Sequence, residues 1–384
     1  VYASPDINGT RPAQLRFSPD GERVSYLRGK DDDQRQQDLW EYHIADGANR
    51  LLVDSRALVP DEEQLDEVEK ARRERMRITG KGIVEYTWAP DGKRILFPLA
   101  GDLYLYDLDR TAKGAVRRLT ETDAFETDAR VSEGGRYVSF IRNQNLFAID
   151  LESGEERQLT SDGGGTLRNG MAEFIAMEEM DRDTGYWWSP DDRYVAFARV
   201  DESPVELAKR YQIFENGFRV TEERYPFTGR NNVRIKLATL EIATGKVVWV
   251  DLGDREDIYL ARVDWTPDSS SLVFQVQSRD QKRLDLMAAD PANGKSRIVL
   301  TETSDVWLNL HHNLHFLEQA PGEFIWASER SGFQHLYRYD LNGRQIAQIT
   351  SGAWVVTSLQ AVDEDRDVLF FDGFADTVLE KHLY

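Results

Sequence analysis

Short runs of alternating apolar and polar residues recur along almost the whole chain. An alternation with a period of two predicts a β-strand that buries one face. Five of these runs directly follow a turn, and they cover residues 24–27, 95–97, 137–141, 194–197 and 272–276. Only two stretches have the composition of a helix, so the pattern predicts a chain built almost entirely of short strands.

The turn that precedes these runs is itself repeated. An aromatic or aliphatic residue is followed by Ser-Pro-Asp-Gly, or by a variant of it, at 17–21, 88–92, 131–135, 188–192 and 265–269. Proline fixes φ at the second turn position, and Asp and Gly tolerate the tight reversal that follows. Each copy therefore predicts a hairpin turn between two strands.

A third and a fourth strand complete the repeating unit. The third often ends in Asp, most clearly at 103–107, 146–150 and 336–340, and the fourth ends near Leu-Thr, as at 119–120 and 159–160. Four short strands in about 40 residues are the pattern of a β-propeller blade. The spacing therefore predicts an all-β fold, a β-propeller of four-stranded blades.

About seven blades are recognisable by this pattern, the last of them incomplete. They lie near residues 15–55, 83–120, 126–160, 172–252, 258–301, 308–350 and 354–384. We expect them to form a single propeller domain over residues 1–384.

Two insertions interrupt the repeat. Residues 60–79 begin with Pro60 and three acids and continue with helix formers and opposite charges four residues apart, which predicts a helical insertion. Residues 201–230 mix charged and aromatic residues and predict an extended arm. Long excursions from a compact blade are usually functional, as a lid, an arm or a partner contact.

Composition narrows the classes of partner. The 384 residues include 68 Asp and Glu against 48 Lys and Arg, so the net charge is −20. Such a charge argues against nucleic acid or an anionic membrane surface as the main partner and favours a cationic ligand. The chain has no cysteine, which excludes disulfides, thiolate nucleophiles and Cys-bound metals. It also has no run of 18 apolar residues, so we expect no membrane span.

The motifs of covalent and cofactor chemistry are missing. No serine has glycine two positions before and after it, as a hydrolase nucleophile elbow needs, and no phosphate-binding glycine motif is present. His311, His312 and His315 form a cluster without an accompanying carboxylate motif, and we favour ordinary hydrogen bonds over metal ligation for them. The sequence therefore predicts no catalytic residue, no metal site and no cofactor in this chain.

One acidic pair stands apart from the repeat. Glu178 and Glu179 are flanked by Met177 and Met180 in a locally apolar stretch. Adjacent side chains converge only where the backbone bends. If they converge in a partly dry pocket, the two carboxylates repel each other and bind a cation, for which a primary ammonium with three donors is well suited. The alternative is a solvated acidic turn.

Several motifs resemble those of bacterial dipeptidyl peptidase IV enzymes, in the prolyl oligopeptidase family of serine peptidases. The segment 178–191, from Glu178-Glu179 to Ser189-Pro190-Asp191, resembles the double-Glu motif of that family. Residues 328–337 resemble its blade signature, and residues 74–86 resemble its arginine-bearing helical insertion. Residues 225–233 match the end of its arm in blade four, with Phe227 and Thr228 where Lys-Ala is usual. The resemblance covers essentially the whole chain.

This resemblance implies a function for the acidic pair. In that family an eight-bladed propeller covers a C-terminal α/β-hydrolase domain with a Ser-Asp-His triad and admits only small peptides. Glu178 and Glu179 would bind the free amino terminus of a peptide, so that X-Pro or X-Ala dipeptides are released. The last blade and the hydrolase domain are absent from this chain, which is expected to be catalytically silent alone.

The resemblance also implies an arginine at the substrate. Arg73 and Arg77, four residues apart on the expected helix, would share one face, and Arg77 is the favoured candidate. Arg72 and Arg75 remain alternatives, and an exposed ion pair with a nearby glutamate is the competing interpretation. The family further implies a homodimer through the 201–230 arm and a periplasmic location.

Two other classes of function remain open. A stand-alone interaction scaffold predicts indifference to the substitution Glu178→Gln and a natural end at Tyr384. An unrelated propeller enzyme, such as a lyase or glycosidase, predicts paired acids from different blades. The peptidase hypothesis predicts a reading frame that continues into a Gly-x-Ser-x-Gly elbow.

Overall fold

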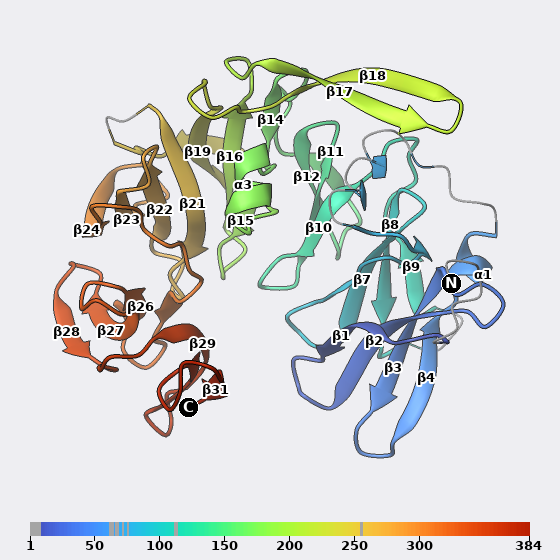
Figure 1. Ribbon diagram of the computed structural model, residues 1–384. Helices are drawn as coiled ribbons and strands as arrows, with labels where there is room; N and C mark the ends of the chain where they lie inside the picture. Colours follow the sequence, from blue (N-terminus) through green and yellow to red (C-terminus); the bar gives the residue numbers. More distant parts are fainter. Residues whose placement is uncertain are drawn as a thin grey trace. The chain divides into compact units, whose positions relative to one another are not determined.

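The computed structural model describes residues 9–60, 65, 69–70, 73–74, 77–110, 114–253 and 256–384. The chain forms two compact units, Val1–Gly164 and Gly165–Tyr384. Regular structure in both units is almost entirely antiparallel β-sheet, as the alternating pattern predicts (Figure 1).

The first unit contains three sheets in its described part, and each is an up-and-down meander. The first sheet also carries a short parallel strand, β5, beside β3. Its strands are β1 (Ala13–Phe17), β2 (Arg23–Gly29), β3 (Gln36–His43), β4 (Ala48–Val53) and β5 (Lys81–Gly82), and helix α1 (Ser55–Leu58) follows β4. The second sheet comprises β6 (Thr87–Trp88), β7 (Arg94–Leu99), β8 (Asp102–Asp107) and β9 (Val116–Arg118). The third comprises β10 (Thr127–Val131), β11 (Tyr137–Arg142), β12 (Asn145–Asp150) and β13 (Glu156–Gln158).

The second unit contains four such sheets and a separate two-stranded ribbon within the described residues. The first sheet comprises β14 (Leu167–Asn169), β15 (Tyr186–Trp188), β16 (Tyr194–Asp201), β19 (Arg234–Glu241) and β20 (Lys246–Trp249), with helix α3 (Phe174–Glu179) between β14 and β15. The ribbon is β17 (Leu207–Phe214) and β18 (Gly217–Arg224). The next sheet comprises β21 (Ile258–Trp265), β22 (Leu272–Ser278), β23 (Arg283–Ala289) and β24 (Ser296–Thr303). The one after it comprises β25 (His315–Phe316), β26 (Glu323–Ser328), β27 (His335–Asp340) and β28 (Gln345–Gln348). The last sheet has three strands, β29 (Val356–Asp363), β30 (Val368–Gly373) and β31 (His382–Leu383).

This arrangement confirms the predicted fold class, a β-propeller type of chain built from four-stranded blades. The described residues form seven meander sheets at the predicted places, and the last lacks a fourth strand. The predicted helical insertion is helical at residues 69–70 and 73–74, and the predicted arm is the β17–β18 ribbon. The assignment of residues 1–384 to a single domain stays a prediction.

The apolar core lies between successive sheets within each unit. In the first unit, Leu96 and Leu105 of the second sheet pack with Val138 and Phe140 of the third. In the second unit, one cluster joins the sheet of β16 to the sheet of β21, and another joins the sheet of β23 to that of β26. Each blade therefore buries its apolar face only by packing against the next one.

The Ser-Pro-Asp-Gly turns have a common hydrogen bond. In four copies a buried hydroxyl at the turn's first position accepts the backbone N–H of the residue five positions later, which begins or precedes the second strand. The bonds are Arg23 N to Ser18 Oγ (3.0 Å), Tyr137 N to Ser132 Oγ (3.0 Å), Tyr194 N to Ser189 Oγ (2.9 Å) and Ser271 N to Thr266 Oγ1 (3.0 Å). The hydroxyl thus closes the turn and satisfies a backbone donor at the end of the hairpin.

The Leu-Thr repeat at the end of the fourth strand has a similar role. Its threonine hydroxyl accepts a backbone N–H near the start of the third strand of the same sheet. The bonds are Leu103 N to Thr120 Oγ1, Leu146 N to Thr160 Oγ1 and Leu336 N to Thr350 Oγ1, each 2.9 Å long. Because each amide is buried, the threonine prevents the cost of an unsatisfied donor.

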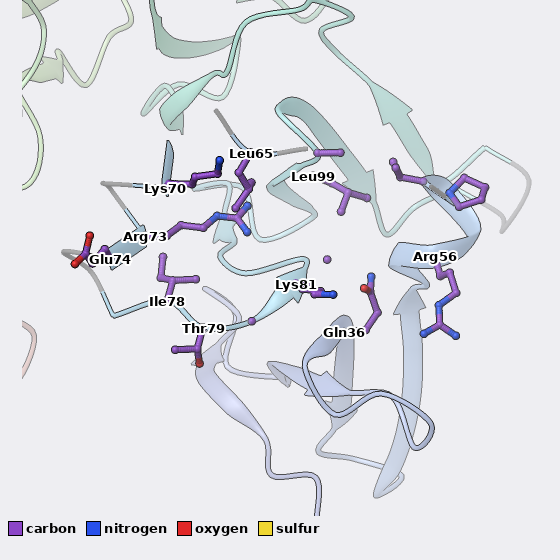
Figure 2. Close-up of a pocket in the computed structure, with 15 residues that line it drawn as sticks. Gln36, Arg56, Leu65, Lys70, Arg73, Glu74, Ile78, Thr79, Lys81 and Leu99 are labelled. Carbon is purple, nitrogen blue, oxygen red and sulfur yellow. The ribbon is translucent and has the colours of Figure 1, made fainter. Parts of the chain in front are cut away.

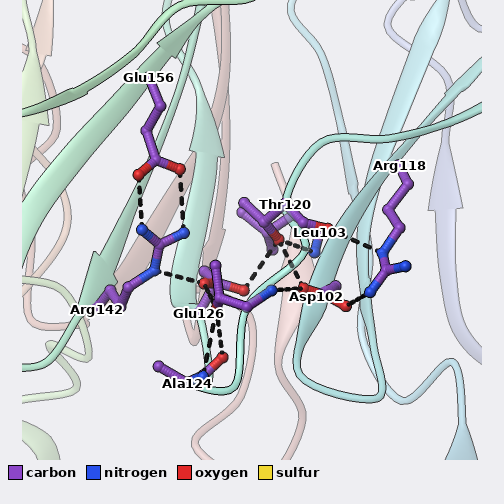
Figure 3. Close-up of polar contacts among 9 residues, drawn as sticks. Asp102, Leu103, Arg118, Thr120, Ala124, Glu126, Arg142 and Glu156 are labelled. Carbon is purple, nitrogen blue, oxygen red and sulfur yellow. Dashed lines mark hydrogen bonds and ion pairs between the residues drawn. The ribbon is translucent and has the colours of Figure 1, made fainter.

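Polar contacts also tie neighbouring blades of the first unit to each other. The buried carboxylate of Glu126 accepts hydrogen bonds from Thr120 Oγ1 (3.0 Å), Thr122 Oγ1 (2.8 Å) and Arg142 Nε (2.6 Å), and Arg142 continues to Glu156 (Figure 3). Thr120 follows the second sheet, whereas Arg142 and Glu156 belong to the third. Glu126 therefore links the two sheets at their edge.

We predict that the substitution Thr160→Val destabilises the fold by roughly 1–3 kcal/mol, because the buried amide of Leu146 loses its acceptor while side-chain volume is nearly kept. Thr160→Ser retains the hydroxyl and serves as the control. Urea unfolding followed by fluorescence measures both. Equal losses of stability in the two variants would contradict the role of the hydroxyl.

Candidate functional site

Glu178 and Glu179 occupy the last turn of α3, and both side chains are exposed. The chain leaves the helix at Met180, which is buried, and Asp181 adopts a left-handed conformation with φ of 51°. The backbone therefore bends after the pair and not between its two residues, which are consecutive helical positions whose side chains diverge by about 100°. The exposed setting places both carboxylates in water rather than in a closed pocket of the second unit.

The composition of α3 does not stabilise it as a helix. It is six residues long, has no acid in its first turn and no base in its last, and Glu173 at its N-cap makes no capping hydrogen bond among the described residues. Two acids lie instead at the C-terminal end, where the helix dipole is negative. The result is a locally negative site that favours a cation.

Contacts outside the helix hold it in place. Arg182 Nη2 pairs with Glu173 Oε2 at 2.7 Å, and the two side chains are 4% and 3% exposed. Arg182 Nη1 also donates to Thr184 O at 2.7 Å. At the other end, the ring of Phe174 contacts that of Tyr225 edge-on, with centroids 5.0 Å apart. The helix is thus joined to the strand that follows it and to the root of the arm.

A second polar cluster lies on β21 and on the segment before β25. Arg262 Nη2 is 3.1 Å from His312 Nε2, and its Nη1 donates to Ala261 O at 2.8 Å. Burial, and then the charge of Arg182, lowers the pKa of Arg262, whereas Asp181 and Asp264 oppose this shift. The charges of Asp181 and Arg182, which follow the acidic pair and Met180, therefore act on Arg262.

The titrating groups around Arg262 are shifted by burial. Burial raises the pKa of Asp264 to about 6, and the positive charge of Arg262 opposes the shift. Burial lowers the pKa of His311 to about 4, and burial and then Arg262 lower that of His312. Both histidines are consequently neutral at neutral pH. His311 contacts the ring of Trp326 edge-on, with centroids 4.5 Å apart.

The aromatic residues after the acidic pair pack in the blade. Tyr186 is fully buried and Trp188 is 6% exposed. Trp187 packs against the core cluster shared with β21, and its carbonyl accepts the Nε1–H of Trp265 at 3.1 Å. These residues anchor the segment that carries Glu178 and Glu179.

The candidate arginines belong to the first unit. Arg73 is buried, and its Nε donates to Glu69 Oε1 at 2.7 Å. Arg73 therefore forms an ion pair with a nearby glutamate, as the competing interpretation proposed, but this ion pair is buried rather than exposed. Arg77 is exposed and has a φ of 55°. Arg72 and Arg75 lie outside the described residues.

The prediction that Arg73 and Arg77 share a helix face is wrong. The N–H of Ile78 donates to Arg73 O at 2.8 Å, and the N–H of Arg77 donates to Glu74 O at 3.1 Å. These two bonds are the Schellman pattern that ends a helix, with Arg77 at the left-handed position where glycine is usual. The helix ends before Arg77, so the Arg77 side chain does not share a helix face with the Arg73 side chain.

A cavity of about 540 Å³ lies beside this insertion in the first unit (Figure 2). Its lining includes the basic side chains of Arg56, Lys70, Arg73 and Lys81, with Glu74 as an acidic member. Basic side chains therefore outnumber acidic ones in the lining of this cavity, although the net charge of the chain is −20.

The sequence did not reveal Glu173, its partner Arg182 or Arg262 as residues of the site. The only signal for the Glu173–Arg182 pair is weak: an acid and a base nine residues apart, on either side of an apolar segment. No sequence signal marks Arg262, because it lies on β21 in another sheet, and the packing of that sheet against the one that carries α3 brings it near the acidic segment.

Within the described residues, no group of three or more His, Asp or Glu side chains is placed to hold a metal ion. Among those residues, no helix is both long and apolar enough to cross a membrane.

Comparisons with known proteins agree with this description. Residues 89–384 match the family described as the Dipeptidyl peptidase IV (DPP IV) N-terminal region. The chain is 26% identical to dipeptidyl peptidase 8 of Mus musculus, over 96% of this chain and 52% of that protein. It is 29% identical to a probable dipeptidyl peptidase 4 of Aspergillus fumigatus, over 67% of this chain and 35% of that protein. The chain thus spans about half the length of the first of these relatives.

Solved structures show the same fold. The dipeptidyl peptidase 4 of Porphyromonas gingivalis superimposes with a TM-score of 0.78 at 23% identity, over 98% of this chain and 52% of that one. A putative dipeptidyl aminopeptidase IV from Bacteroides ovatus superimposes with a TM-score of 0.70 at 20% identity, over the same shares. Because the family model covers more than half of the sequence, the chain belongs to the family of dipeptidyl peptidase IV N-terminal regions.

Proposed function

We propose that this chain is the propeller part of a dipeptidyl aminopeptidase and that Glu178 and Glu179 bind the free amino terminus of its peptide substrates. The observation that carries the proposal is the placement of two exposed carboxylates on the last turn of a short helix whose two ends are joined by a buried ion pair. An ammonium group has three donors, and each charge-assisted hydrogen bond contributes roughly 1.5–3 kcal/mol.

Anchoring the amino terminus sets the register of cleavage. A serine nucleophile at a fixed distance from the anchor then meets the bond after the second residue, which gives release of X-Pro or X-Ala dipeptides. The nucleophile belongs to a C-terminal α/β-hydrolase domain with a Ser-Asp-His triad, outside this chain. The propeller restricts access to small peptides, and the enzyme works in the periplasm. Support for this fuller description comes from the family to which the chain belongs.

Arg77 is the better of the two described arginine candidates for a substrate contact. Its side chain is exposed, whereas Arg73 is buried and engaged by Glu69. A left-handed conformation at a residue other than glycine is a strained choice that is common at functional positions. In this proposal Arg73 has a structural role, since its ion pair with Glu69 stabilises the helix that precedes Arg77.

We predict that Glu178→Gln and Glu179→Gln each raise KM for a Gly-Pro chromogenic amide by roughly ten-fold or more, with a smaller effect on kcat, because they remove binding that is similar in the ground and transition states. The complete product of the gene is assayed, with Glu155→Gln as a control at an exposed glutamate of the first unit. A wild-type protein that hydrolyses nothing, or Glu178→Gln and Glu179→Gln variants with the wild-type KM, would overturn the proposal in favour of a scaffold.

We also propose that the β17–β18 ribbon joins two copies of the protein. Its exposed side chains include Leu207, Tyr211, Ile213, Phe214 and Phe218, which are 57–83% exposed. Apolar patches of this kind usually mark interaction surfaces. In sequence, residues 201–230 resemble the dimerisation arm of the dipeptidyl peptidase IV family.

We predict that the double substitution Ile213→Asp and Phe218→Asp converts the dimer to a monomer, because it places charge in a desolvated contact. Sedimentation velocity on the complete gene product gives the mass. Glu215→Asp, at the tip of the same ribbon, is the control that keeps its charge. A wild-type protein that is already monomeric at micromolar concentration is the contrary result.

A further inference from the structure

The orientation of the acidic pair has to come from outside α3. A helix of six residues is far too short to be stable by itself. In α3 neither end carries the complementary charges that stabilise a helix, and its two acids lie at the unfavourable end. The direction in which Glu178 and Glu179 point is therefore set by the contacts that the segment makes with its surroundings.

One buried ion pair connects the two ends of this segment. Glu173 immediately precedes the first residue of α3, and Arg182 follows the last residue by three positions. Their side chains meet at 2.7 Å and are almost fully buried. The backbone N–H of Arg182 also donates to Ala176 O at 3.0 Å. The segment between them is thus closed into a loop of fixed shape, with the acidic pair on its exposed side.

The remaining contacts of Arg182 fix this loop to the blade. Its Nη1 donates to Thr184 O at 2.7 Å, and its guanidinium lies over the ring of Trp187 at 5.9 Å from the centroid. Thr184 leads into β15 and Trp187 lies within it, and β15 pairs with β16. Arg182 therefore connects the start of α3, its end and the sheet beneath it.

The energetics of such a pair favour a role in conformation over a role in stability. Burying two charges has a desolvation cost that often equals or exceeds their attraction, so an apolar replacement of both is frequently tolerated. The presence of a buried ion pair in this position is therefore better explained by the single geometry that it imposes on the segment. A guanidinium that donates to a carboxylate and a carbonyl at once restricts both partners in direction as well as in distance.

We infer that Glu173 and Arg182 are positioning residues for the amino-terminus anchor, which they hold without contacting substrate. The inference rests on the proposed function of Glu178 and Glu179 and extends it to the residues that orient them. Neither side chain is exposed enough to reach a ligand, so their effect on binding passes through the shape of α3.

The test compares variants of the complete gene product in hydrolysis of a Gly-Pro chromogenic amide. We expect Glu173→Gln to raise KM by roughly ten-fold while kcat changes by less than about three-fold, as for a loss of ground-state positioning. The double variant Glu173→Met with Arg182→Met removes both charges, and we expect it to fold and to show the same raised KM. Arg182→Lys keeps the charge and is expected to restore part of the affinity relative to Arg182→Met.

A matched control separates positioning from general damage. Glu126 is likewise a buried glutamate bonded to an arginine, Arg142, at 2.6 Å; the Arg142 side chain is 11% exposed, and the pair lies in the first unit. We expect Glu126→Gln to lower Tm by as much as Glu173→Gln and to leave KM unchanged. Hydrogen exchange of residues 174–180 gives a readout independent of hydrolysis, and it should accelerate in Glu173→Gln and not in Glu126→Gln.

The outcomes distinguish this inference from the proposed function. If Glu178→Gln raises KM but the folded Glu173→Gln and double-Met variants bind as the wild type does, the positioning role is wrong and the anchor stands. If Glu178→Gln leaves KM unchanged, the anchor itself is wrong, whatever the hydrogen exchange shows. A raised KM in Glu126→Gln equal to that in Glu173→Gln also overturns the positioning role.

Discussion

A four-stranded antiparallel meander has two faces, and it cannot bury either one by itself. This constraint governs the chain, because each sheet contributes apolar side chains to a cluster that it shares with its neighbour, as Leu96 and Phe140 do in the first unit. Backbone groups at the sheet ends then have to be satisfied without disturbing that packing, and the turn serines and the strand-end threonines do so. Departures from the repeat are consequently found between strands rather than within them. The helical insertion, α3 and the arm all lie in such connections.

This division explains what could be predicted from the sequence. The repeat is visible because residues such as Ser132, Pro190 and Thr160 are required by local geometry, which recurs in each blade. The double-Glu segment could be recognised because it departs from that repeat. The partnership of Glu173 with Arg182 depends on how the chain turns around α3, and the proximity of Arg262 depends on how two neighbouring sheets pack. Arg77 was misplaced because helix propensity alone does not show where a helix ends when an arginine occupies the left-handed position that glycine usually fills.

The segment around α3 departs from nearly every rule that the rest of the chain obeys. Its helix is uncapped among the described residues, its acids lie at the negative end of the helix dipole, and its ends are joined by a buried ion pair. Local features that conflict with stability are typical of functional sites, where the surrounding fold supplies the missing support. Here that support comes from Tyr186 and Trp188, which are buried in the blade beside the segment.

The exposure of the acidic pair has a consequence for selectivity. Two unit charges 4 Å apart in water interact by only about 1 kcal/mol, so two neighbouring exposed carboxylates are tolerated at little cost. A ligand that covers them lowers the local dielectric, and the repulsion grows unless the ligand itself carries positive charge. An ammonium group cancels that repulsion and satisfies both acceptors, whereas an acylated amino terminus brings one neutral donor and leaves a carboxylate without a partner. Buried charges without a partner are costly. Under the proposed function, discrimination for free amino termini therefore arises from the second glutamate as much as from the first, and it depends on both being held in one orientation when the ligand arrives.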